Sequence, residues 1–295
     1  MPLLKAEAEK LSNNQLVAGV ITEIIDRDDL FAILPFTQVN GKAYVYNREN
    51  ALATADWLDP NEEVKESAST FTEVTTNLRI LAGDVDVDKF LMTTMGDTNS
   101  QLAIQLSAKA KALGREFRKV LATGNHSTNN KQFDGVAKLV ASTQKIDATK
   151  KPLTFAMLDE LLDMIPLGAD CIMMRSGTYR AYLQLLRATS GTNAPLVMME
   201  NFGRPMLTHN GVPIIVNDFI PKTDNSGDVC EIYAMRLNET DGLHGLYGGS
   251  NAGIVVENLG TVQNKDAVRT RMKWYCGLAL KSTKSLAALT NVPNV

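Results

Sequence analysis

The feature that most constrains the fold is a long apolar stripe in the first half of the chain. Its members recur at steps of three or four residues, the period of one helix face: Leu102, Leu106, Ala110, Leu113, Phe117 and Leu121. Asp97 or Thr98 can cap the start of this helix, and Gly124 follows its last turn. At about 1.5 Å per residue, a helix over 98–122 is roughly 37 Å long. The sequence therefore predicts a helix that crosses a whole domain and packs on one side.

Positive charge gathers on the back of this predicted helix. Five basic residues lie there: Lys109, Lys111, Arg115, Arg118 and Lys119. We expect this side to stay in water or to meet negative charge. The chain as a whole is slightly acidic, with a formal net charge of -3 and a pI near 5.7. This balance argues against a protein whose entire surface neutralises phosphates, so any contact with nucleic acid must be local.

A polar ribbon precedes the helix. Residues 39–47 are typical of a strand with Tyr44 and Tyr46 on one face, and a second strand-like run covers 71–81. Between them lie roughly two dozen residues, mostly small or polar, with Trp57 as the only large aromatic. Such a stretch buries too little apolar surface to order itself, and an isolated two-stranded ribbon is marginal in water. The ribbon is therefore either flexible or covered by a neighbouring subunit.

The segment before the ribbon combines a helical pattern with an apolar run. Residues 12–15 have capping-box spacing, and apolar residues recur behind them at helical intervals as far as Ile25. The apolar run 30–36 then contains Pro35, which resists helix formation. We expect a short amphipathic helix followed by an extended segment that needs a surface to lie against.

Helices and strands alternate from about 153 to 257. A helical apolar face follows Thr154, a short buried strand covers 171–174, and another helix follows Ser176. The remaining segments are strands at 212–217, 231–236 and 254–256, a turn-rich connection at 222–228 and a glycine-rich stretch at 241–253. We interpret residues 248–253 within this stretch as a flexible turn between strands. The alternation predicts a compact mixed α/β lobe.

A stripe of cations follows near the end of the chain. Residues 268–274 alternate with a period of two, which places Arg269, Arg271 and Lys273 on one face of a strand. Such a stripe is able to contact nucleic acid. A solvated face or a row of salt bridges between subunits explains it more simply, because most charge runs in proteins are of that kind.

The sequence contains no motif typical of catalysis or of metal or cofactor binding. His126, His209 and His244 have no second histidine or carboxylate at metal-ligand spacing. The glycine-rich stretch lacks the last glycine of a nucleophile elbow, because Ala252 stands there, and no Gly-Lys-Ser/Thr follows it. The cysteines are far apart and predict reduced, buried thiols: Cys171, Cys230 and Cys276. We expect no catalytic residue, no cofactor and no metal.

The sequence also bears on location. The N-terminus lacks the apolar core of a signal peptide, and no later stretch approaches the ~20 apolar residues of a membrane span. We expect a protein that is made and kept in the cytoplasm, with no membrane partner.

The order of these parts resembles the major capsid proteins of tailed bacteriophages, whose fold is shared with encapsulin compartments. The most specific match is the stretch G-V-P-I-I-V-N-D-F-I-P at 211–221. Softer matches are the turn after the long helix at 121–136, the helix and strand at 153–174, and the closing segment at 265–279. Together these matches follow the family's order along essentially the whole chain.

The resemblance implies an α+β fold, the phage major-capsid fold, with an N-terminal arm, an extended β-hairpin loop, a peripheral domain with a long spine helix, and an α/β axial domain. The expected bounds are 1–36 for the arm, 37–82 for the loop, 83–140 and 258–295 for the peripheral domain, 98–122 for the spine helix, and 141–257 for the axial domain. The tip of the axial domain is expected near 189–205 or 241–253.

The resemblance further implies a structural subunit that self-assembles into an icosahedral shell enclosing phage double-stranded DNA. Pentamers and hexamers, a separate scaffold, a portal, and non-specific contact with packaged DNA are the implied partners, in a virion assembled in the host cytoplasm. Aromatic residues of the arm and loop are the candidates for contact between subunits: Phe31, Phe36, Tyr44, Tyr46, Trp57 and Phe71. An encapsulin-like shell around protein cargo is the first alternative, and a soluble α/β enzyme built on 153–257 is the second.

Overall fold

The computed structural model of the chain describes residues 30, 33–89, 98–190, 196–198, 205–223, 229–249 and 253–294. Several predictions fall outside these residues: the N-terminal helix near 12–25, the contact candidate Phe31, much of the stretch 189–205, and most of the turn-rich connection at 222–228.

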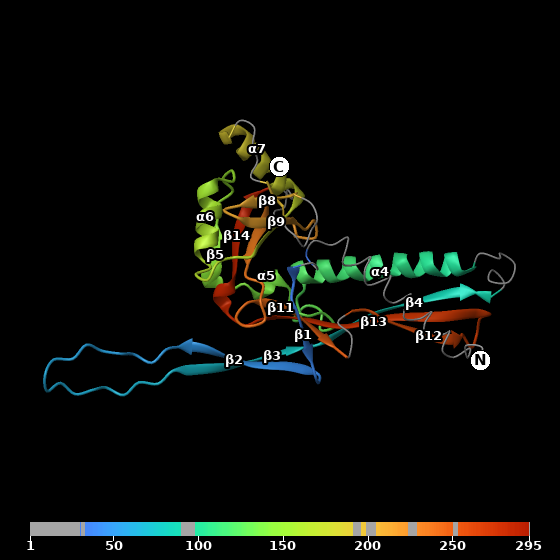
Figure 1. Ribbon diagram of the computed structural model, residues 1–295, viewed down its shortest axis with the longest axis horizontal. Helices are drawn as coiled ribbons and strands as arrows, with labels where there is room; N and C mark the ends of the chain where they lie inside the picture. Colours follow the sequence, from blue (N-terminus) through green and yellow to red (C-terminus); the bar gives the residue numbers. More distant parts are fainter. Residues whose placement is uncertain are drawn as a thin grey trace.

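A long helix on a sheet forms one part of the molecule (Figure 1). The predicted helix is present as α4 (Thr98–Thr123). The sheet below it has five strands: β1 (Phe36–Val39), β4 (Arg79–Asp88), β11 (Leu243–Gly248), β12 (Val255–Thr261) and β13 (Ala267–Leu280). Their order is β1-β11-β13-β12, and β4 pairs with β13 as well. β13 is therefore the central strand of the sheet, because three other strands pair with it.

Side chains that alternate along the strands fill the space between α4 and the sheet. Val85 and Val87 of β4 and Met272 and Trp274 of β13 are buried there. The Phe117 ring centroid lies 4.7 Å from that of Trp274. The predicted helical stripe is confirmed over its described side chains, all of which are buried: Leu106, Ala110, Leu113, Phe117 and Leu121. Burying each large apolar side chain contributes roughly 1.5–3 kcal/mol, so this layer stabilises the long helix.

A second, mixed sheet of seven strands forms an α/β lobe. Its strands, in spatial order, are β5 (Lys145–Asp147), β14 (Leu286–Pro293), β10 (Val229–Met235), β6 (Cys171–Met174), β9 (Val212–Val216), β8 (Pro205–His209) and β7 (Leu196–Met198). All four residues of β6 are buried. A short strand with both faces covered is what the continuous apolar run at 171–174 predicts.

Helices flank this lobe. α6 (Phe155–Asp163) begins behind Thr154, whose side chain accepts a hydrogen bond from the Met157 backbone N–H, as the capping pattern predicts. α7 is Ser176–Ser190. The remaining short helices are α5 (Val136–Leu139) and the 3-10 turns η1 (Ser142–Gln144) and η3 (Thr283–Ser285).

The two faces of the seven-stranded sheet belong to different cores. Ile172, Met174 and Ala234 pack with apolar residues of α6 and α7. Cys171 and Met173 point the other way and join the cluster that contains the α4 side chains. The core is thus continuous from the lobe to the long helix, so the two sheets form one body.

The two sheets draw their strands from both sides of the expected domain bounds. β14 lies within 258–295 but pairs with β10 and β5 of the lobe. β11 lies within 141–257 but pairs with β1 and β13 under the long helix. The chain crosses between the sheets near 236–243 and again near 281–286, so each sheet draws strands from both sides of the expected boundaries.

The first half of the glycine-rich stretch 241–253 is a strand. Residues 243–248 form the strand β11, in which Leu243, His244 and Leu246 are buried. Gly245 faces the Phe36 ring, which occupies the space of a side chain at that position. A glycine in a strand interior usually weakens the strand because it has no side chain to pack, but here the Phe36 ring fills that space. The sequence pattern alone does not show that Phe36 packs on Gly245.

Candidate assembly interface

A two-stranded ribbon projects from the five-stranded sheet (Figure 1). Its strands are β2 (Ala43–Ala51) and β3 (Thr70–Asn77), which pair antiparallel, with Tyr46 opposite Val74. The predicted second strand at 71–81 covers nearly all of β3 and the start of β4, so the chain passes directly from the ribbon into the sheet. Every residue from 49 to 68 is exposed.

The outer part of the ribbon displays large apolar side chains to solvent. The exposed fraction is 102% for Trp57, 75% for Leu52, 74% for Val64 and 66% for Phe71. Few polar contacts hold this part together, among them a hydrogen bond from the Ser67 hydroxyl to a backbone carbonyl across the ribbon. Residues 49–68 include six carboxylates and one lysine. The outer ribbon is therefore an acidic strip with apolar side chains that its own chain does not cover.

The root of the ribbon, in contrast, is fastened to its own chain. The Tyr46 hydroxyl donates to the Leu280 carbonyl at 2.6 Å, and Arg48 donates to the same carbonyl at 2.7 Å. The Tyr44 ring meets the buried His244 ring edge-on, with centroids 5.6 Å apart. Burial raises the pKa of Tyr46 and lowers the pKa of His244, so both groups remain neutral near pH 7.

The structure separates the predicted contact residues into two groups. Trp57 lies on the outer ribbon, and Phe71 is exposed next to it on β3. Tyr44 and Tyr46 pack at the ribbon's root, and the Phe36 ring lies 5.9 Å from that of Trp274 inside the core cluster. Phe36, Tyr44 and Tyr46 make contacts within their own chain, because strand pairing brings β11 and β13 beneath them. Their contact with a neighbouring subunit stays a prediction.

The face of the five-stranded sheet opposite α4 holds a row of ion pairs. Arg269 donates to both carboxylate oxygens of Asp86, each at 2.7 Å, and Arg271 binds Asp84 in the same bidentate way at 2.7 and 2.8 Å. Lys273 pairs with Glu257 on β12. The hydrogen bonds from Arg271 and Arg269 hold the pKa of Asp84 and of Asp86 below the ordinary value.

Among the described residues the cation stripe finds its ion-pair partners within its own chain. The acidic side of the row was missed in the sequence. Its signal is the alternation Asp84-Val85-Asp86-Val87-Asp88, which has the same period of two as the cation stripe. Pairing of β4 with β13 then sets Asp86 opposite Arg269 and Asp84 opposite Arg271.

Beside the ion pairs the same sheet face is hollowed and partly apolar. Ile80, Ala82, Arg271, Lys273 and Tyr275 are among the residues that line the hollow. The exposed fraction of Ile80 is 71%. The hollow is therefore an apolar patch beside charged side chains that already form ion pairs. Another protein surface can cover such a region without leaving an unpaired charge buried.

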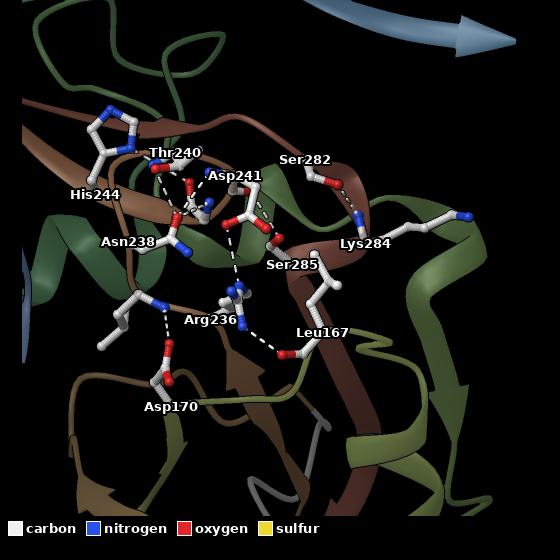
Figure 2. A network of polar contacts seen from close by, with 12 residues as sticks. Leu167, Asp170, Arg236, Asn238, Thr240, Asp241, His244, Ser282, Lys284 and Ser285 are labelled. Carbon is white, nitrogen blue, oxygen red and sulfur yellow. Dashed lines mark hydrogen bonds and ion pairs between the residues drawn. The ribbon is translucent and has the colours of Figure 1, made fainter. Parts of the chain in front are cut away.

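A network of hydrogen bonds stabilises the segment in which the chain passes from the seven-stranded to the five-stranded sheet (Figure 2). The Asn238 side-chain oxygen accepts from the backbone N–H groups of Thr240, Asp241 and Gly242, at 3.0, 2.8 and 2.7 Å. Arg236 donates to Asp241 at 3.2 Å. Asn238 thus shapes the loop that leads from β10 into β11, and it fixes how the lobe meets the sheet under α4.

The described residues hold no group of three or more histidine, cysteine or acidic side chains that could bind a metal ion. Folding brings His209 to 2.8 Å from an oxygen of Asp159 and 3.1 Å from the Tyr182 hydroxyl, which the sequence spacing did not indicate. Tyr182 is fully buried, so its hydroxyl has no access to a substrate. Burial raises the pKa of the Cys276 thiol to about 12.

No helix among the described residues is long and apolar enough to cross a membrane.

One family model matches this chain, and solved structures share its fold. The model of the phage capsid family matches residues 10–290. The chain is similar to the holo-SrpI encapsulin complex from Synechococcus elongatus PCC 7942, with a TM-score of 0.72 and 22% identity over 90% of this chain and 88% of that chain. It is also similar to the capsid of a native GTA particle, with a TM-score of 0.63 and 15% identity over 89% of both chains.

A third similar structure is that of Microbacterium phage Oxtober96, with a TM-score of 0.62 and 15% identity over 89% of this chain and 90% of that chain. No curated protein matches the sequence. At these identities the structural likeness establishes the capsid fold, and the family match covers most of the chain.

Proposed function

This chain belongs to the phage capsid family, and we propose that its outer ribbon, residues 49–68, fastens the shell by docking on a neighbouring copy of the same chain. The chain is a structural, non-enzymatic subunit that self-assembles into a capsid shell and forms part of the virion. The contact made by the ribbon explains how one such subunit binds the next.

Exposure of the outer ribbon is the observation that supports this docking. Residues 49–68 are exposed throughout, and the ribbon extends beyond its own body (Figure 1). An uncovered two-stranded ribbon is marginally stable in water. A neighbour that covers Trp57 and Leu52 removes their apolar surface from water and stabilises the ribbon in return. Trp is also enriched among the residues that dominate binding energy at protein interfaces.

We propose the hollowed sheet face as the surface that receives the ribbon. It offers Ile80 and Tyr275 as apolar contacts. Its cations Arg271 and Lys273 are already paired with Asp84 and Glu257, so covering them leaves no uncompensated charge in the interface. This arrangement is heterologous, since each copy presents a ribbon to one neighbour and a sheet face to another. Such contacts form a ring when the rotation from one copy to the next closes.

We further propose a division of the subunit that follows its sheets. The five-stranded sheet with α4 corresponds to the peripheral domain, over roughly 79–140 and 243–281, and the seven-stranded sheet corresponds to the axial domain. The axial domains meet at the centres of pentamers and hexamers. Assembly takes place in the host cytoplasm with a separate scaffold and a portal, and the finished shell encloses double-stranded DNA.

Truncation of the ribbon tests the docking directly. Ala51 pairs with Thr70, so residues 52–69 can be replaced by Asn-Gly, which closes a two-residue hairpin turn. We expect soluble, folded subunits that form no closed shells in negative-stain microscopy, whereas the full chain forms them. An unchanged thermal unfolding midpoint is the control for folding, because the removed residues are exposed. Closed shells from the truncated chain would defeat the proposal.

A shell around protein cargo is the second candidate, favoured by the TM-score of 0.72 to the encapsulin complex. The contents of particles isolated from cells that produce the chain with its native neighbours distinguish the two candidates. Nuclease-protected double-stranded DNA supports the capsid, and a co-purifying protein without DNA supports the compartment.

A further inference from the structure

The two helices that flank the α/β lobe carry opposite charge. Residues 152–174, which contain α6, include four aspartates or glutamates and no lysine or arginine. Residues 175–190, which contain α7, include three arginines and no acidic residue. Charge is therefore segregated between two helices of one lobe.

The fold of the lobe itself uses part of this charge. Three of the seven charged side chains make hydrogen bonds inside the lobe: Asp159, Asp170 and Arg175. The other four are exposed: Glu160, Asp163, Arg180 and Arg187. Within the part of the chain that the structure describes, none of these four forms an ion pair. Two negative and two positive charges of the lobe are thus left to solvent or to a partner.

The exposed side of α6 is acidic. Glu160 and Asp163 are three positions apart and lie on one side of the helix, whereas Leu158 and Leu161 are buried in the lobe core. We call Glu160 and Asp163 the acidic face of α6. Asp163 is the last residue of the helix, where the negative end of the helix dipole disfavours a carboxylate. The helix itself therefore does not account for a carboxylate at this position.

An exposed apolar side chain follows the acidic face. Leu167 lies in the turn after α6, and its exposed fraction is 63%. Few large apolar side chains of the lobe are left in water in this way, because those of α6 and α7 mostly pack on the seven-stranded sheet. A surface that covered Leu167 would remove apolar area from water as well as meet the neighbouring carboxylates.

The exposed side of α7 is basic. Arg180 and Arg187 are seven positions apart, almost two full turns, with the exposed Gln184 between them. Tyr182 and Leu186 of the same helix are buried. We call Arg180 and Arg187 the basic face of α7. Arginine binds carboxylates with two parallel hydrogen bonds and is enriched at protein interfaces, where lysine is depleted.

The acidic and basic faces do not neutralise each other within one copy. α6 and α7 meet through their inner sides, where the Phe155 and Tyr182 rings lie edge to face with centroids 6.0 Å apart. In Figure 1 α6 lies along the left side of the lobe and α7 lies at its top. Because every copy carries both faces, a second copy of the same chain supplies the opposite charge to each.

We propose that the acidic face of α6 in one copy docks on the basic face of α7 in the next copy. This proposal deepens the proposed function and rests on it, since there the axial domains of neighbouring copies meet. The contact is heterologous, so it repeats from copy to copy. Its arginine–carboxylate pairs set the orientation of neighbouring lobes, because complementary charge selects the register of an interface.

Charge reversal on the full-length chain tests this contact. The variants Glu160→Arg, Asp163→Arg and Arg180→Glu, Arg187→Glu each set like charges against each other. Each should raise the protein concentration at which shells form, measured by light scattering, by at least about tenfold. The thermal unfolding midpoint of the unassembled subunit should stay the same, because all four side chains are exposed.

The variant with all four substitutions supplies the decisive comparison. It restores opposite charges with their signs exchanged and keeps the net charge of the unsubstituted chain. Its threshold concentration should return to within about threefold of the unsubstituted value. Two changes that merely harmed separate helices would instead add their effects. The matched control Lys145→Glu, Lys284→Glu reverses two exposed cations elsewhere on the lobe and should leave the threshold nearly unchanged.

Three outcomes would overturn the proposal: either reversed pair assembling at the unsubstituted concentration, no recovery in the variant with all four substitutions, or an equal loss in the lysine control. Failure of the ribbon docking is a separate result, because truncation of the ribbon leaves all four charges of the lobe in place.

Discussion

The ring of Phe36 fills the space that a side chain on Gly245 would need. This contact fastens β1, the strand that leads into the ribbon, to β11, and the Gly245 N–H also donates to the Pro35 carbonyl at 2.8 Å. The Phe36 ring reaches from there to Phe117 of α4, with centroids 6.3 Å apart. Gly245 thus leaves room for the Phe36 ring of β1 to pack between β11 and the long helix.

Gly245→Ala should destabilise the subunit by about 1–3 kcal/mol, because the new methyl group forces the Phe36 ring out of a packed core. Gly277→Ala is the matched control, since a Cβ on Gly277 of the neighbouring strand meets its surroundings at 3.5 Å, an ordinary contact. Urea unfolding of the unassembled chain measures both variants. Equal midpoints for the two would contradict this account of Gly245.

Asn238→Ala should destabilise the crossing between the sheets by about 1–3 kcal/mol, because three backbone N–H groups lose their acceptor. Asn238→Asp keeps an oxygen at the same place and should lose much less. The difference in urea midpoint between the two variants measures the contribution of the acceptor. If both variants were equally stable, the side-chain oxygen would not be what shapes the loop.

The subunit should become less stable at low pH, because the carboxylates of the ion-pair row become protonated. Asp84 and Asp86 have pKa values lowered from 3.8 by hydrogen bonds from Arg271 and Arg269. A carboxyl with a lower pKa in the folded chain stabilises it above the unfolded pKa, and this stabilisation is lost as the pH falls through the folded value. The free energy of unfolding should therefore decrease below about pH 4.

The double variant Asp84→Asn, Asp86→Asn tests the source of that acid sensitivity. It should be less stable than the unsubstituted chain at pH 7 and should show a smaller further loss below about pH 4. Some acid sensitivity should remain, because Asp147 and Asp218 also have lowered pKa values. A variant whose pH profile ran parallel to that of the unsubstituted chain would show that the row contributes nothing to it.

Trp57→Ala should leave the isolated subunit as stable as before, because the side chain is fully exposed. Shell assembly should weaken by at least about 1.4 kcal/mol per contact, a tenfold rise in the concentration needed, if Trp57 anchors the ribbon on a neighbour. Light scattering against protein concentration measures this threshold. Val45→Ala, on the exposed inner part of the ribbon, is the control and should have little effect on it.

Tryptophan fluorescence is a second measure of whether Trp57 becomes buried on assembly. The chain has two tryptophans, and Trp274 is already buried in the subunit. Assembly should therefore shift the emission to shorter wavelength through Trp57, and Trp57→Phe should abolish the shift while still allowing shells. A shift that persisted in Trp57→Phe would mean that Trp57 stays in water.

Local patterns were enough to predict most of the secondary structure. The helix at 98–123, the capped helix after Thr154 and the strand at 171–174 all follow from the spacing of apolar residues and caps, which neighbours in sequence determine. The exposed outer ribbon was predictable as well, since a stretch with so few apolar residues has no core of its own to form.

Tertiary structure alone decided which distant residues meet. Arg271 and Asp84 are 187 positions apart, and only the pairing of β13 with β4 sets them opposite each other. The same long-range pairing turned Phe36, Tyr44 and Tyr46 toward their own chain and moved β11 and β14 to sheets other than those expected. Periodicity determines the face on which a side chain lies, but the strand that covers this face depends on the path of the whole chain, which no local pattern contains.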